Sequence, residues 1–498
     1  MGSANKVVSG AVWSMLLNVV NGIYGFIAVP ILIRYFGKAE YGLIGLATSV
    51  NVYVQLMDMG FNSTNLRFFS AWLAKRNSDK IKKLFQTSLA FYGLIGLLNA
   101  IVLIVVSFFT PQLFHLTAAQ DEIIKNLFYI LAISALVSWF SSCFDQLIRA
   151  TENVAWIQRR SLLPKLFQIV VLFLTIICKL SIEWYFVLTT FAAFIILPMS
   201  VNKIKKETPY VLFIPKFDIP TLKEMLPYAL NIFSFSIFQF SFYNLRPVFL
   251  GIQGTVESVT DYRVMNGIVG FITMFSGVFL NALLPSSAKA VAQGNKDAYY
   301  RVAYDGTKYI SIVLCFCAFG MMSISRDLLT IYVGESYLYL LPWLYMWLLC
   351  TLGSHNQAIS SLILSGSDIR AISYSSMVAS IVGLALSWIL IPSFQIGGVV
   401  IAFAVYLAIQ LGFYYLIYWP KFMKINSWRV FYYAFMPSVL IGLISFGICG
   451  FLPSVDEAWW NIIVKGSVFA VAFAILVYLT LNKQDKMFMK SVLSKGNK

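Results

Sequence analysis

The feature that most constrains this chain is a series of apolar runs, each long enough to cross a lipid bilayer. A spanning helix needs about 20 consecutive, mainly apolar residues. The runs are continuously apolar rather than alternating, which favours helices over membrane strands. We therefore predict an all-α polytopic membrane protein with about fourteen transmembrane helices. They are expected at residues 8–33, 41–64, 85–109, 123–149, 161–180, 183–201, 226–249, 258–285, 306–325, 339–364, 371–391, 397–419, 431–452 and 460–481.

The composition agrees with this class. Of the 498 residues, 59% are hydrophobic and only 12% are charged, which is about half the charged share of a soluble domain. The same numbers exclude disordered chains, collagens, coiled coils and small disulfide scaffolds. The six cysteines all fall in apolar runs, so neither a disulfide framework nor a metal site is indicated.

The distribution of positive charge predicts which side of the membrane each loop occupies. The net charge is +16, from 37 basic and 21 acidic residues. If the N-terminus lies inside, most Lys and Arg residues fall in short inside loops, as the positive-inside bias requires. Both termini are thus expected in the cytoplasm, and charge spread over many loops excludes a nucleic-acid partner. The basic residues expected on the outer side are Arg34, Lys38, Lys125, Lys179, Arg246, Arg263, Arg326 and Lys465.

Motifs that carry enzyme chemistry are absent from the sequence. No two glycines are separated by one residue, so there is no dinucleotide-binding G-x-G-x-x-G. The single Gly-Lys pair, Gly37-Lys38, is followed by Ala39, so there is no Walker A motif. There is no D-x-D pair, and there are only two histidines. We expect the protein not to be an enzyme and to hold no catalytic residue, metal or cofactor.

Four predicted helices carry polar side chains at helical spacing, which is costly at membrane depth. Residues three or four apart share one helix face. Serines and glycines in such stripes commonly pack helices together. Asparagine, aspartate and arginine are instead expected to face a cavity, because an arginine at the helix centre costs about 2.5–3.5 kcal/mol. The stripes are Ser14, Asn18, Asn21 and Gly25; Thr48, Asn51, Gln55, Asp58, Asn62 and Asn65; Ser236, Gln239, Tyr243 and Arg246; and Arg263, Asn266, Gly270, Thr273, Gly277 and Asn281.

Two further polar groups have a structural interpretation. Asp145 and Arg149 are four residues apart near the inner end of the fourth span, which predicts a local ion pair. His355 lies in a polar cluster of the tenth span, and we interpret it as a satisfied buried histidine rather than a proton-coupling one.

The polar stripes come in two pairs separated by six helices, which indicates an internal repeat. Ala74-x-x-Asn77-x-Asp79 aligns with Ala292-x-x-Asn295-x-Asp297 at an offset of 218 residues. Six is an even number, so the two halves have the same orientation, as in transporters built from parallel repeats. We predict a six-helix lobe at 1–205, a second six-helix lobe at 206–420, and an extra helix pair with a cytoplasmic tail at 421–498. The two lobes are expected to surround a central cavity.

Several segments resemble the polysaccharide transporter family, which belongs to the superfamily of multidrug-and-toxin extruders and lipid II flippases. The resemblance is carried by Pro30-Ile-Leu-Ile-Arg-Tyr-Phe-Gly37-Lys-Ala-Glu-Tyr-Gly42, by Asp58-Met-Gly60 and its continuation through Arg67 to Lys75, and by Pro285-Ser-Ser-Ala-Lys-Ala-Val-Ala-Gln-Gly294-Asn-Lys-Asp297. It implies a flippase for lipid-linked oligosaccharides in the bacterial inner membrane, serving O-antigen, capsule or exopolysaccharide synthesis. In that superfamily helices 1, 2, 7 and 8 line the cavity, and the polar stripes fall on those four. Helices 13 and 14 would, by analogy, guide the polyprenyl tail.

The resemblance also implies roles and partners. The substrate would be an undecaprenyl-pyrophosphate-linked oligosaccharide, moved by alternating access coupled to an H⁺ or Na⁺ gradient. A polysaccharide polymerase and a chain-length regulator are possible partners besides membrane lipid. Arg246 and Arg263 are expected to bind the pyrophosphate, because guanidinium groups pair with phosphate oxygens. Arg67 is expected to attract the head group at the cytoplasmic mouth, and the residues expected to bind sugar hydroxyls are Asn18, Asn21, Asn51, Asn62, Gln239 and Asn266.

Two questions stay open at this point. Asp58 is the best candidate for the ion-coupling site, but pairing with a nearby arginine such as Arg67 explains its presence equally well. A cation-driven multidrug extruder and a lipid II flippase are the alternative functions. The extruder predicts an acidic cavity, whereas this one combines arginine with asparagine.

Overall fold

The computed structural model shows an all-helical chain, and no strand occurs in the part that it describes. The contacts between residues divide the chain into two compact units. The first comprises Met1–Gly267 and Ser380–Val399, and the second comprises Ile268–Ala379 and Val400–Lys498. The described residues are 3–58, 60–366, 370–453 and 457–481.

The first unit holds the N-terminal helices, of which α1, α4, α6 and α7 are each long and apolar enough to cross a bilayer, as is the continuous stretch of α8, η2 and α9. Three further helices, α11 (Val256–Ala292), α16 (Arg370–Phe394) and α17 (Ile396–Phe413), have residues in both units. The helices that lie wholly in the first unit are α1 (Ser3–Phe36), α2 (Lys38–Val54), η1 (Gln55–Asp58), α3 (Phe61–Ala74), α4 (Ser78–Phe108), α5 (Thr110–Phe114), α6 (Ala118–Ala150), α7 (Val154–Ile177), α8 (Ile182–Phe191), η2 (Ala192–Ile196), α9 (Leu197–Glu207) and α10 (Ile219–Gln253).

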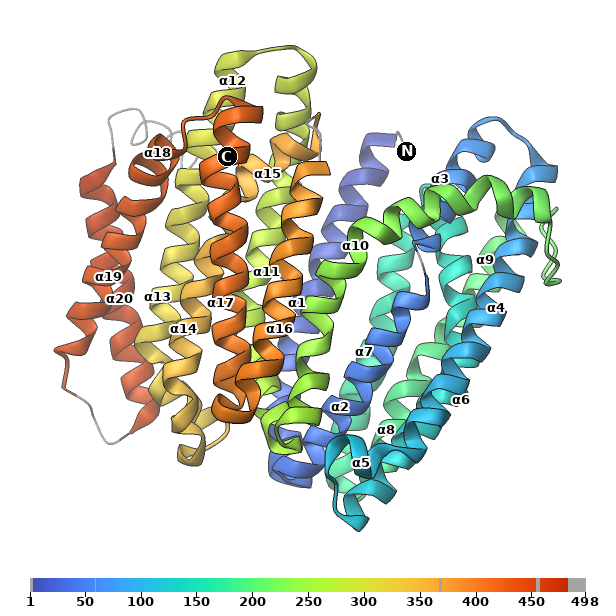
Figure 1. Cartoon of the computed structure of the whole chain (residues 1–498), viewed down its shortest axis with the longest axis horizontal. Coiled ribbons are helices and arrows are strands. Elements are labelled where there is room, and N and C mark those ends of the chain that lie inside the picture. Colours follow the sequence, from blue (N-terminus) through green and yellow to red (C-terminus); the bar gives the residue numbers. More distant parts are fainter. Residues whose placement is uncertain (1–2, 59, 367–369, 454–456, 482–498) are drawn as a thin grey trace. The chain divides into compact units, whose positions relative to one another are not determined.

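The core of the first unit is aromatic. The long helices α4 and α6 run side by side (Figure 1), and α3 packs against both. Phe61, Phe85 and Tyr92 are fully buried between them, and the Tyr92 ring stacks on Trp139 with centroids 5.9 Å apart. Burial of a large aromatic side chain contributes about 1.5–3 kcal/mol, so this cluster fixes the position of Tyr92 inside the unit.

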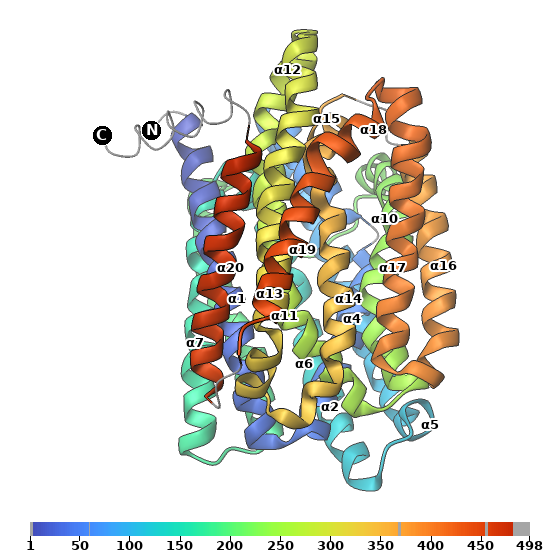
Figure 2. The ribbon, with the colours of Figure 1, turned by 90° about the vertical axis from the view of Figure 1, so that its left-hand side faces the viewer.

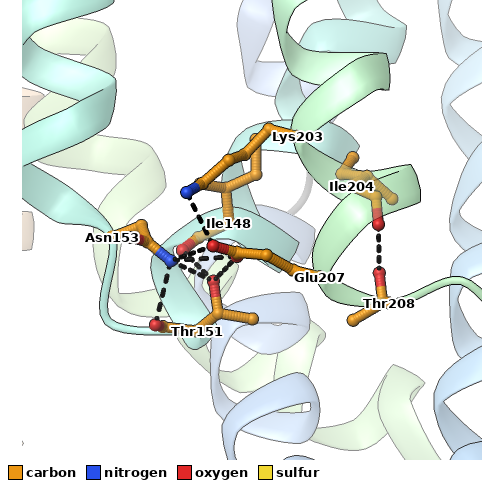
Figure 3. A network of polar contacts seen from close by, with 7 residues as sticks. All are labelled: Ile148, Thr151, Asn153, Lys203, Ile204, Glu207 and Thr208. Carbon is orange, nitrogen blue, oxygen red and sulfur yellow. Dashed lines mark hydrogen bonds and ion pairs between the residues drawn. The ribbon is translucent and has the colours of Figure 1, made fainter.

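A polar network ties the turn between α6 and α7 to the end of α9 (Figure 3). The carboxylate of Glu207 accepts hydrogen bonds from Thr151 Oγ1 at 2.8 Å and from Asn153 Nδ2 at 2.9 and 3.0 Å. Lys203, one helical turn earlier, lies 2.7 Å from the same carboxylate. The turn itself contains Glu152 with φ +62°, a strained conformation for a residue with a side chain, so these contacts help to hold it.

The second unit is also helical, and three of its segments are π-helices, η3, η6 and η7. Besides the shared helices it contains α12 (Lys296–Arg301), η3 (Val302–Gly306), α13 (Thr307–Tyr332), η4 (Glu335–Leu340), α14 (Leu341–Thr351), η5 (Leu352–Asn356), α15 (Gln357–Leu364), η6 (Tyr414–Met423), α18 (Ser427–Arg429), η7 (Val430–Phe435), α19 (Met436–Gly450) and α20 (Ala458–Thr480).

Close contacts hold α13 against α19 and α20 in the second unit (Figure 2). Gly442 of α19 lets the fully buried ring of Phe319 approach, because a Cβ there would lie only 2.2 Å from the ring. Asp327 of α13 accepts a hydrogen bond from Asn461 at 3.0 Å and forms an ion pair with Lys465 at 2.8 Å. Both partners belong to α20. An apolar helix such as α20 gains its rotational position from these polar contacts.

The number of spanning helices differs from the predicted fourteen. Within the described ranges, eleven helices are long and apolar enough to cross a membrane, and a twelfth is obtained if α10, bent by 54° near residue 235, counts as one span. The class of an all-α polytopic membrane protein is thus confirmed, but the count of fourteen is not. The predicted lobe boundaries at 205 and 420 stay a prediction, and the tail beyond residue 481 lies outside the described residues.

The second predicted span is wrong in one respect, because it is not one continuous helix. It is divided into α2, the short 3₁₀ segment η1 and α3, and neither α-helical part reaches 18 residues. The helix α3 starts after Gly60, whose φ of +77° is the left-handed conformation that favours glycine. A Cβ on Gly60 would lie 2.7 Å from the carbonyl oxygen of Ala229 in α10. The glycine thus permits both the break and the close approach of α10.

The predicted ion pair between Asp145 and Arg149 does not form. Asp145 Oδ1 instead accepts from Arg160 Nη2 of α7 at 2.7 Å. Arg160 is 2% exposed and also donates to Ser200 of α9. A buried arginine needs a charged partner, so this tertiary contact prevails over the pair within one helix. Arg160 thus joins α6, α7 and α9.

Candidate functional site

A polar cavity of about 300 Å³ lies inside the first unit. Asp58 stands at its wall, at the end of η1, where the chain leaves the helical path. Helices α2, η1, α3, α4, α6 and α10 all contribute to the lining. The lining residues are Asn51, Gln55, Asp58, Asn62, Asn99, Ser138, Trp139, Ser142 and Phe240.

The break in the second predicted span shapes this cavity. Asn51 and Gln55 precede the break, Asp58 ends η1, and Asn62 begins the next helix. Both oxygens of the Asp58 carboxylate accept from the backbone N–H of Asn62 at 3.2 Å. The aspartate therefore caps the start of α3, where unpaired backbone N–H groups favour a negative charge.

Tyr92 connects Asp58 to the interior of the unit. Its hydroxyl lies 3.1 Å from Asp58 Oδ1 and 3.0 Å from Asn62 Oδ1, both within hydrogen-bond reach. It accepts a hydrogen bond from Asn65 Nδ2 at 3.3 Å. A tyrosine hydroxyl carries one proton, so it can donate to only one of the two oxygens at a time.

This arrangement is short of one proton when Asp58 is ionised. One of the two oxygen–oxygen contacts at Tyr92 then lacks a hydrogen. A protonated Asp58 supplies it, because its carboxyl O–H can donate to Tyr92 Oη while the tyrosine donates to Asn62 Oδ1. The cluster is thus fully hydrogen-bonded in the protonated state, and an ionised Asp58 leaves one contact unsatisfied.

Further hydrogen bonds hold these groups in place. Asn65 is fully buried and accepts from Ser88 Oγ at 2.8 Å, which orients its amide toward Tyr92. Gln146 of α6 donates to Asn62 Oδ1 at 3.3 Å. Such networks are rigid when all members are satisfied, so the position of Asp58 is set by three helices, not by the stripe alone.

Among the described residues of this site, Asn99 has a buried side-chain oxygen without a hydrogen bond. It lines the cavity from α4, is 2% exposed, and its Oδ1 makes no hydrogen bond within the described residues. A buried carbonyl oxygen without a partner costs about 1–3 kcal/mol. The oxygen is available to a water, an ion or a ligand hydroxyl that enters the cavity.

The structure brings together three of the predicted site residues, Asn51, Asp58 and Asn62, in this one cavity. The alternative pairing of Asp58 with Arg67 is not found. Arg67 instead stacks over the ring of Tyr228 in α10, at 4.1 Å from its guanidinium carbon to the ring centroid. Asp58 is therefore free of an arginine counter-ion in the described part of the chain.

The two arginines predicted to bind pyrophosphate lie against aromatic rings. Arg246 of α10 is 4% exposed and faces Tyr243 at 5.1 Å and Tyr262 at 5.8 Å. Arg263 of α11 lies 4.9 Å from the ring of Tyr41 and donates to Thr48 Oγ1 at 3.4 Å. Contacts of this kind stabilise a cation at low solvent exposure. Neither arginine lines the Asp58 cavity.

The remaining predicted residues lie apart from the cavity. Asn18 and Asn21 are exposed on α1, Gln239 on α10 and Asn266 on α11, and Asn266 belongs to the part of α11 in the first unit. Their roles stay predictions. The side chain of Asn281, the last of the eighth stripe, lies outside the described residues.

The polar stripes of the sequence did not predict two residues of this site, Tyr92 and Asn99. Tyr92 and Asn99 lie in the run 85–109, where apolar neighbours conceal them. The signal that could have found Asn99 is its isolation, because a single asparagine in an apolar spanning helix is costly.

His355, in the second unit, is satisfied as predicted: its ring nitrogens contact Leu352 O at 2.8 Å and Tyr415 Oη at 2.6 Å. No cluster that could hold a metal occurs among the described residues.

Comparison with known proteins agrees with this architecture. A family described as polysaccharide biosynthesis protein matches residues 7–291, which is more than half of the chain. Among curated proteins no sequence matches. The fold is similar to that of the lipid II flippase MurJ in an inward closed conformation, with a TM-score of 0.73 at 12% identity, over 98% of this chain and 100% of that one.

Two transporters of a related kind have the same fold. An inward-facing multidrug resistance MATE family transporter of the MOP superfamily superposes with a TM-score of 0.59 at 12% identity, over 88% of this chain and all of that one. A eukaryotic MATE transporter, AtDTX14, gives 0.58 at 12% identity, over 86% and 99%. At such low identity the likeness concerns the fold.

Proposed function

The chain belongs to the polysaccharide biosynthesis protein family, and from this premise we propose that it is a flippase for undecaprenyl-pyrophosphate-linked oligosaccharide repeat units. It moves them from the cytoplasmic to the periplasmic leaflet of the bacterial inner membrane by ion-coupled alternating access. The product serves O-antigen, capsule or exopolysaccharide synthesis, with a polymerase and a chain-length regulator acting afterwards. The likeness to MurJ and to MATE transporters is consistent with a transporter and not an enzyme.

The observation that carries the proposal is the polar cavity around Asp58. Six elements of an apolar unit converge on amide, hydroxyl and carboxylate groups, and polar groups at membrane depth usually mark a substrate or ion pathway. Sugars present many hydroxyls, and Asn51 and Asn62 offer both donors and acceptors to them. Asp58 is the one charged residue of the lining and neither arginine lies in it, so the charge of the cavity does not separate a saccharide from a cationic drug; the preference for a saccharide rests on the family.

We assign the coupling step to Asp58. Its cluster lacks one proton when the carboxyl group is ionised and is complete when the group is protonated. Proton uptake therefore stabilises the arrangement in which η1, α3 and α4 are joined through Tyr92. Proton release leaves the contact between Tyr92 Oη and Asn62 Oδ1 without a hydrogen and so weakens the link between α4 and α3. The two protonation states then favour different conformations, as a coupled transporter needs.

Arg246 and Arg263 are proposed to receive the pyrophosphate when the cavity opens. Aromatic rings contact both guanidinium groups, and Arg263 also donates to Thr48 Oγ1. A phosphate oxygen competes well with such contacts, because charge-assisted hydrogen bonds are about twice as strong as neutral ones.

The test of coupling uses the purified protein in proteoliposomes with a fluorescent undecaprenyl-pyrophosphate-linked oligosaccharide. The flipping rate is measured with and without a pH gradient. Asp58→Asn is expected to flip at a rate that no longer responds to the gradient, since the amide cannot exchange a proton. Asp79→Asn, the same change at an exposed position in the first turn of α4, is the matched control and keeps the response.

Further arms distinguish the alternatives. A response to a Na⁺ gradient but not to a pH gradient would assign the coupling to Na⁺. Faster transport of lipid II or of ethidium than of the oligosaccharide lipid would replace the proposed substrate. In cells that depend on this protein for surface polysaccharide, Arg246→Ala with Arg263→Ala is expected to abolish the polymer, and undiminished polymer at matched expression would refute the pyrophosphate role.

A further inference from the structure

An apolar groove of about 680 Å³ runs along the second unit between α14, α17 and α19. Its wall is made of leucine, alanine and aromatic side chains, and its polar groups are few. His355 and Tyr415, which lie in the wall, satisfy each other at 2.6 Å. Gly412 contributes an open stretch, because nothing lies within 4 Å of the position of its missing Cβ. The groove has the shape and chemistry of a site for hydrocarbon chains.

A polar pocket of about 540 Å³ lies in the same unit, where α12, η3 and α18 meet. Figure 2 shows α12 and α18 at the same end of the unit. The pocket is lined by three basic residues, Arg301, Lys424 and Arg429, and by two acidic ones, Asp297 and Asp305.

The basic groups of this pocket are available to a ligand. Arg301 and Lys424 are exposed and form no ion pair among the described residues. Arg429 contacts the ring of Tyr304, 4.5 Å from its guanidinium carbon to the centroid. One of the two carboxylates, Asp305, accepts a hydrogen bond from Tyr433 at 3.3 Å. The balance favours an anion.

The groove and the pocket are continuous. A third hollow, of about 550 Å³, shares Tyr415, Leu416 and Trp428 with the groove and Lys424 and Asn426 with the pocket. A single molecule can therefore lie with its chains in the groove and an anionic group at the pocket.

The loop between the two hollows is held rigidly by tyrosines. Tyr299 Oη donates to Met423 O and Tyr300 Oη donates to Lys424 O, both at 3.4 Å. Tyr304 Oη accepts from the backbone N–H of Asn426 at 3.1 Å. The backbone of the loop is thus occupied, so that its side chains remain for a ligand. The π-helices η6 and η7 flank the loop, and such segments occur frequently at functional sites.

Large aromatic side chains mark this end of the unit as a membrane interface. Trp428 and Tyr432 are each 64% exposed and Phe422 is 59% exposed. Tryptophan and tyrosine are enriched at the level of lipid headgroups, and Lys or Arg residues near that level attract anionic lipids. The basic pocket therefore lies where phosphate groups of the bilayer are found.

We propose that the groove and the pocket bind one anionic glycerophospholipid of the adjacent leaflet. Its acyl chains occupy the groove beside Gly412, and its phosphate pairs with Lys424 and Arg301, with Arg429 completing the pocket. The site belongs to the second unit and does not depend on the proposed transport function. The lipid joins α12, α18 and α19 and stabilises the unit.

The test measures binding of dioleoylphosphatidylglycerol to the purified full-length protein by native mass spectrometry. Dioleoylphosphatidylcholine, with the same chains and no net charge, is the reference lipid. Lys424→Gln with Arg301→Gln is expected to weaken phosphatidylglycerol binding about tenfold or more, at about 1 kcal/mol for each basic residue. Lys289→Gln with Lys296→Gln removes the same charge at exposed positions of this unit that do not line the pocket, and it is expected to keep the affinity.

A second variant tests the groove. Gly412→Phe fills it and is expected to weaken binding about tenfold, because the acyl chains lose buried surface. Gly447→Phe is its control, since Gly447 also has open space around its missing Cβ but does not line the groove. Unchanged binding in Gly412→Phe overturns the proposal, as does an equal loss in the Lys289 and Lys296 control. Tighter binding of undecaprenyl phosphate, lost in the same variants, would assign the site to a polyprenyl lipid and overturn it too.

Discussion

Replacement of Gly60 by alanine tests whether the break before α3 is a requirement of the fold. Gly60 has φ +77° and ψ 9°, and a residue with a side chain in this conformation costs about 1–2 kcal/mol. The new Cβ would lie 2.7 Å from the carbonyl oxygen of Ala229 and 3.1 Å from Cβ of Ile232. Ordinary contact begins at 3.4 Å, so backbone atoms must move by roughly 0.7 Å, an overpacking cost of about 1–3 kcal/mol.

The sum is a loss of about 2–5 kcal/mol in the free energy of unfolding. The assay is a titration of the purified protein in mixed micelles with a denaturing detergent, followed by far-ultraviolet circular dichroism. Gly25→Ala is the matched control, because Gly25 lies inside α1 with open space around it. Alanine there is expected to leave stability unchanged or to raise it by up to about 1 kcal/mol.

A second variant separates the two contributions. Asparagine tolerates the left-handed conformation better than alanine, but its Cβ meets Ala229 in the same place. Gly60→Asn should therefore regain part of the conformational cost and none of the steric cost. Equal stability of Gly60→Ala and Gly25→Ala would refute the reasoning, since neither the conformation nor the close approach of α10 would then matter.

Three further predictions concern other parts of the chain. Lys465→Met leaves the carboxylate of Asp327 without its counter-ion and is expected to cost about 3 kcal/mol of unfolding free energy; an unchanged value would contradict the role of the pair. Gly442→Ala places a Cβ 2.2 Å from the ring of Phe319 and is expected to cost about 3 kcal/mol, measured in the same titration, where wild-type stability would disprove the packing argument. Asp218 caps α10, and hydrogen bonds from the first turn lower the pKa of its carboxyl group. Asp218→Ala should therefore cost about 1 kcal/mol at neutral pH, and its difference from wild type should shrink as pH falls below about 4; a difference independent of pH would contradict the assignment.

The spanning helices were predictable because the requirement for them is local. A bilayer-crossing helix satisfies its own backbone, so an apolar run of sufficient length indicates it without knowledge of its neighbours. The runs at 85–109 and 123–149 became α4 and α6 with ends displaced by several residues. The count was less predictable, because the break at η1 is followed by a glycine in the left-handed conformation that α10 approaches closely.

The polar stripe of the second span was informative but incomplete. It identified Asn51, Asp58 and Asn62, which do line one cavity. It did not identify Tyr92, whose hydroxyl joins two of them. Periodicity detects groups on the same helix face, whereas a hydrogen-bonded cluster also draws on other helices.

Charge pairs show the same limit. The spacing of Asp145 and Arg149 favoured a pair within one helix, which is worth about 0.2–0.5 kcal/mol at an exposed position. The structure pairs Asp145 with Arg160, which comes from the next helix and is almost completely buried. Burial raises the cost of an unpaired charge far above that of an exposed one, and sequence spacing does not report burial.

The sequence by itself thus determined the class of the protein, the apolar helices, the bias of positive charge and the polar faces that suggested a transporter. Each of these follows from the bilayer as a solvent. Lipid requires every spanning segment to be apolar outside and to satisfy its own backbone hydrogen bonds, and positive charge is biased to one side. Only the tertiary structure decided which polar groups meet. The break at Gly60, the contact of Asp58 with Tyr92 and the ion pair of Arg160 depend on side chains that are far apart in the chain. Their energies come from burial and geometry, which are properties of the packed unit.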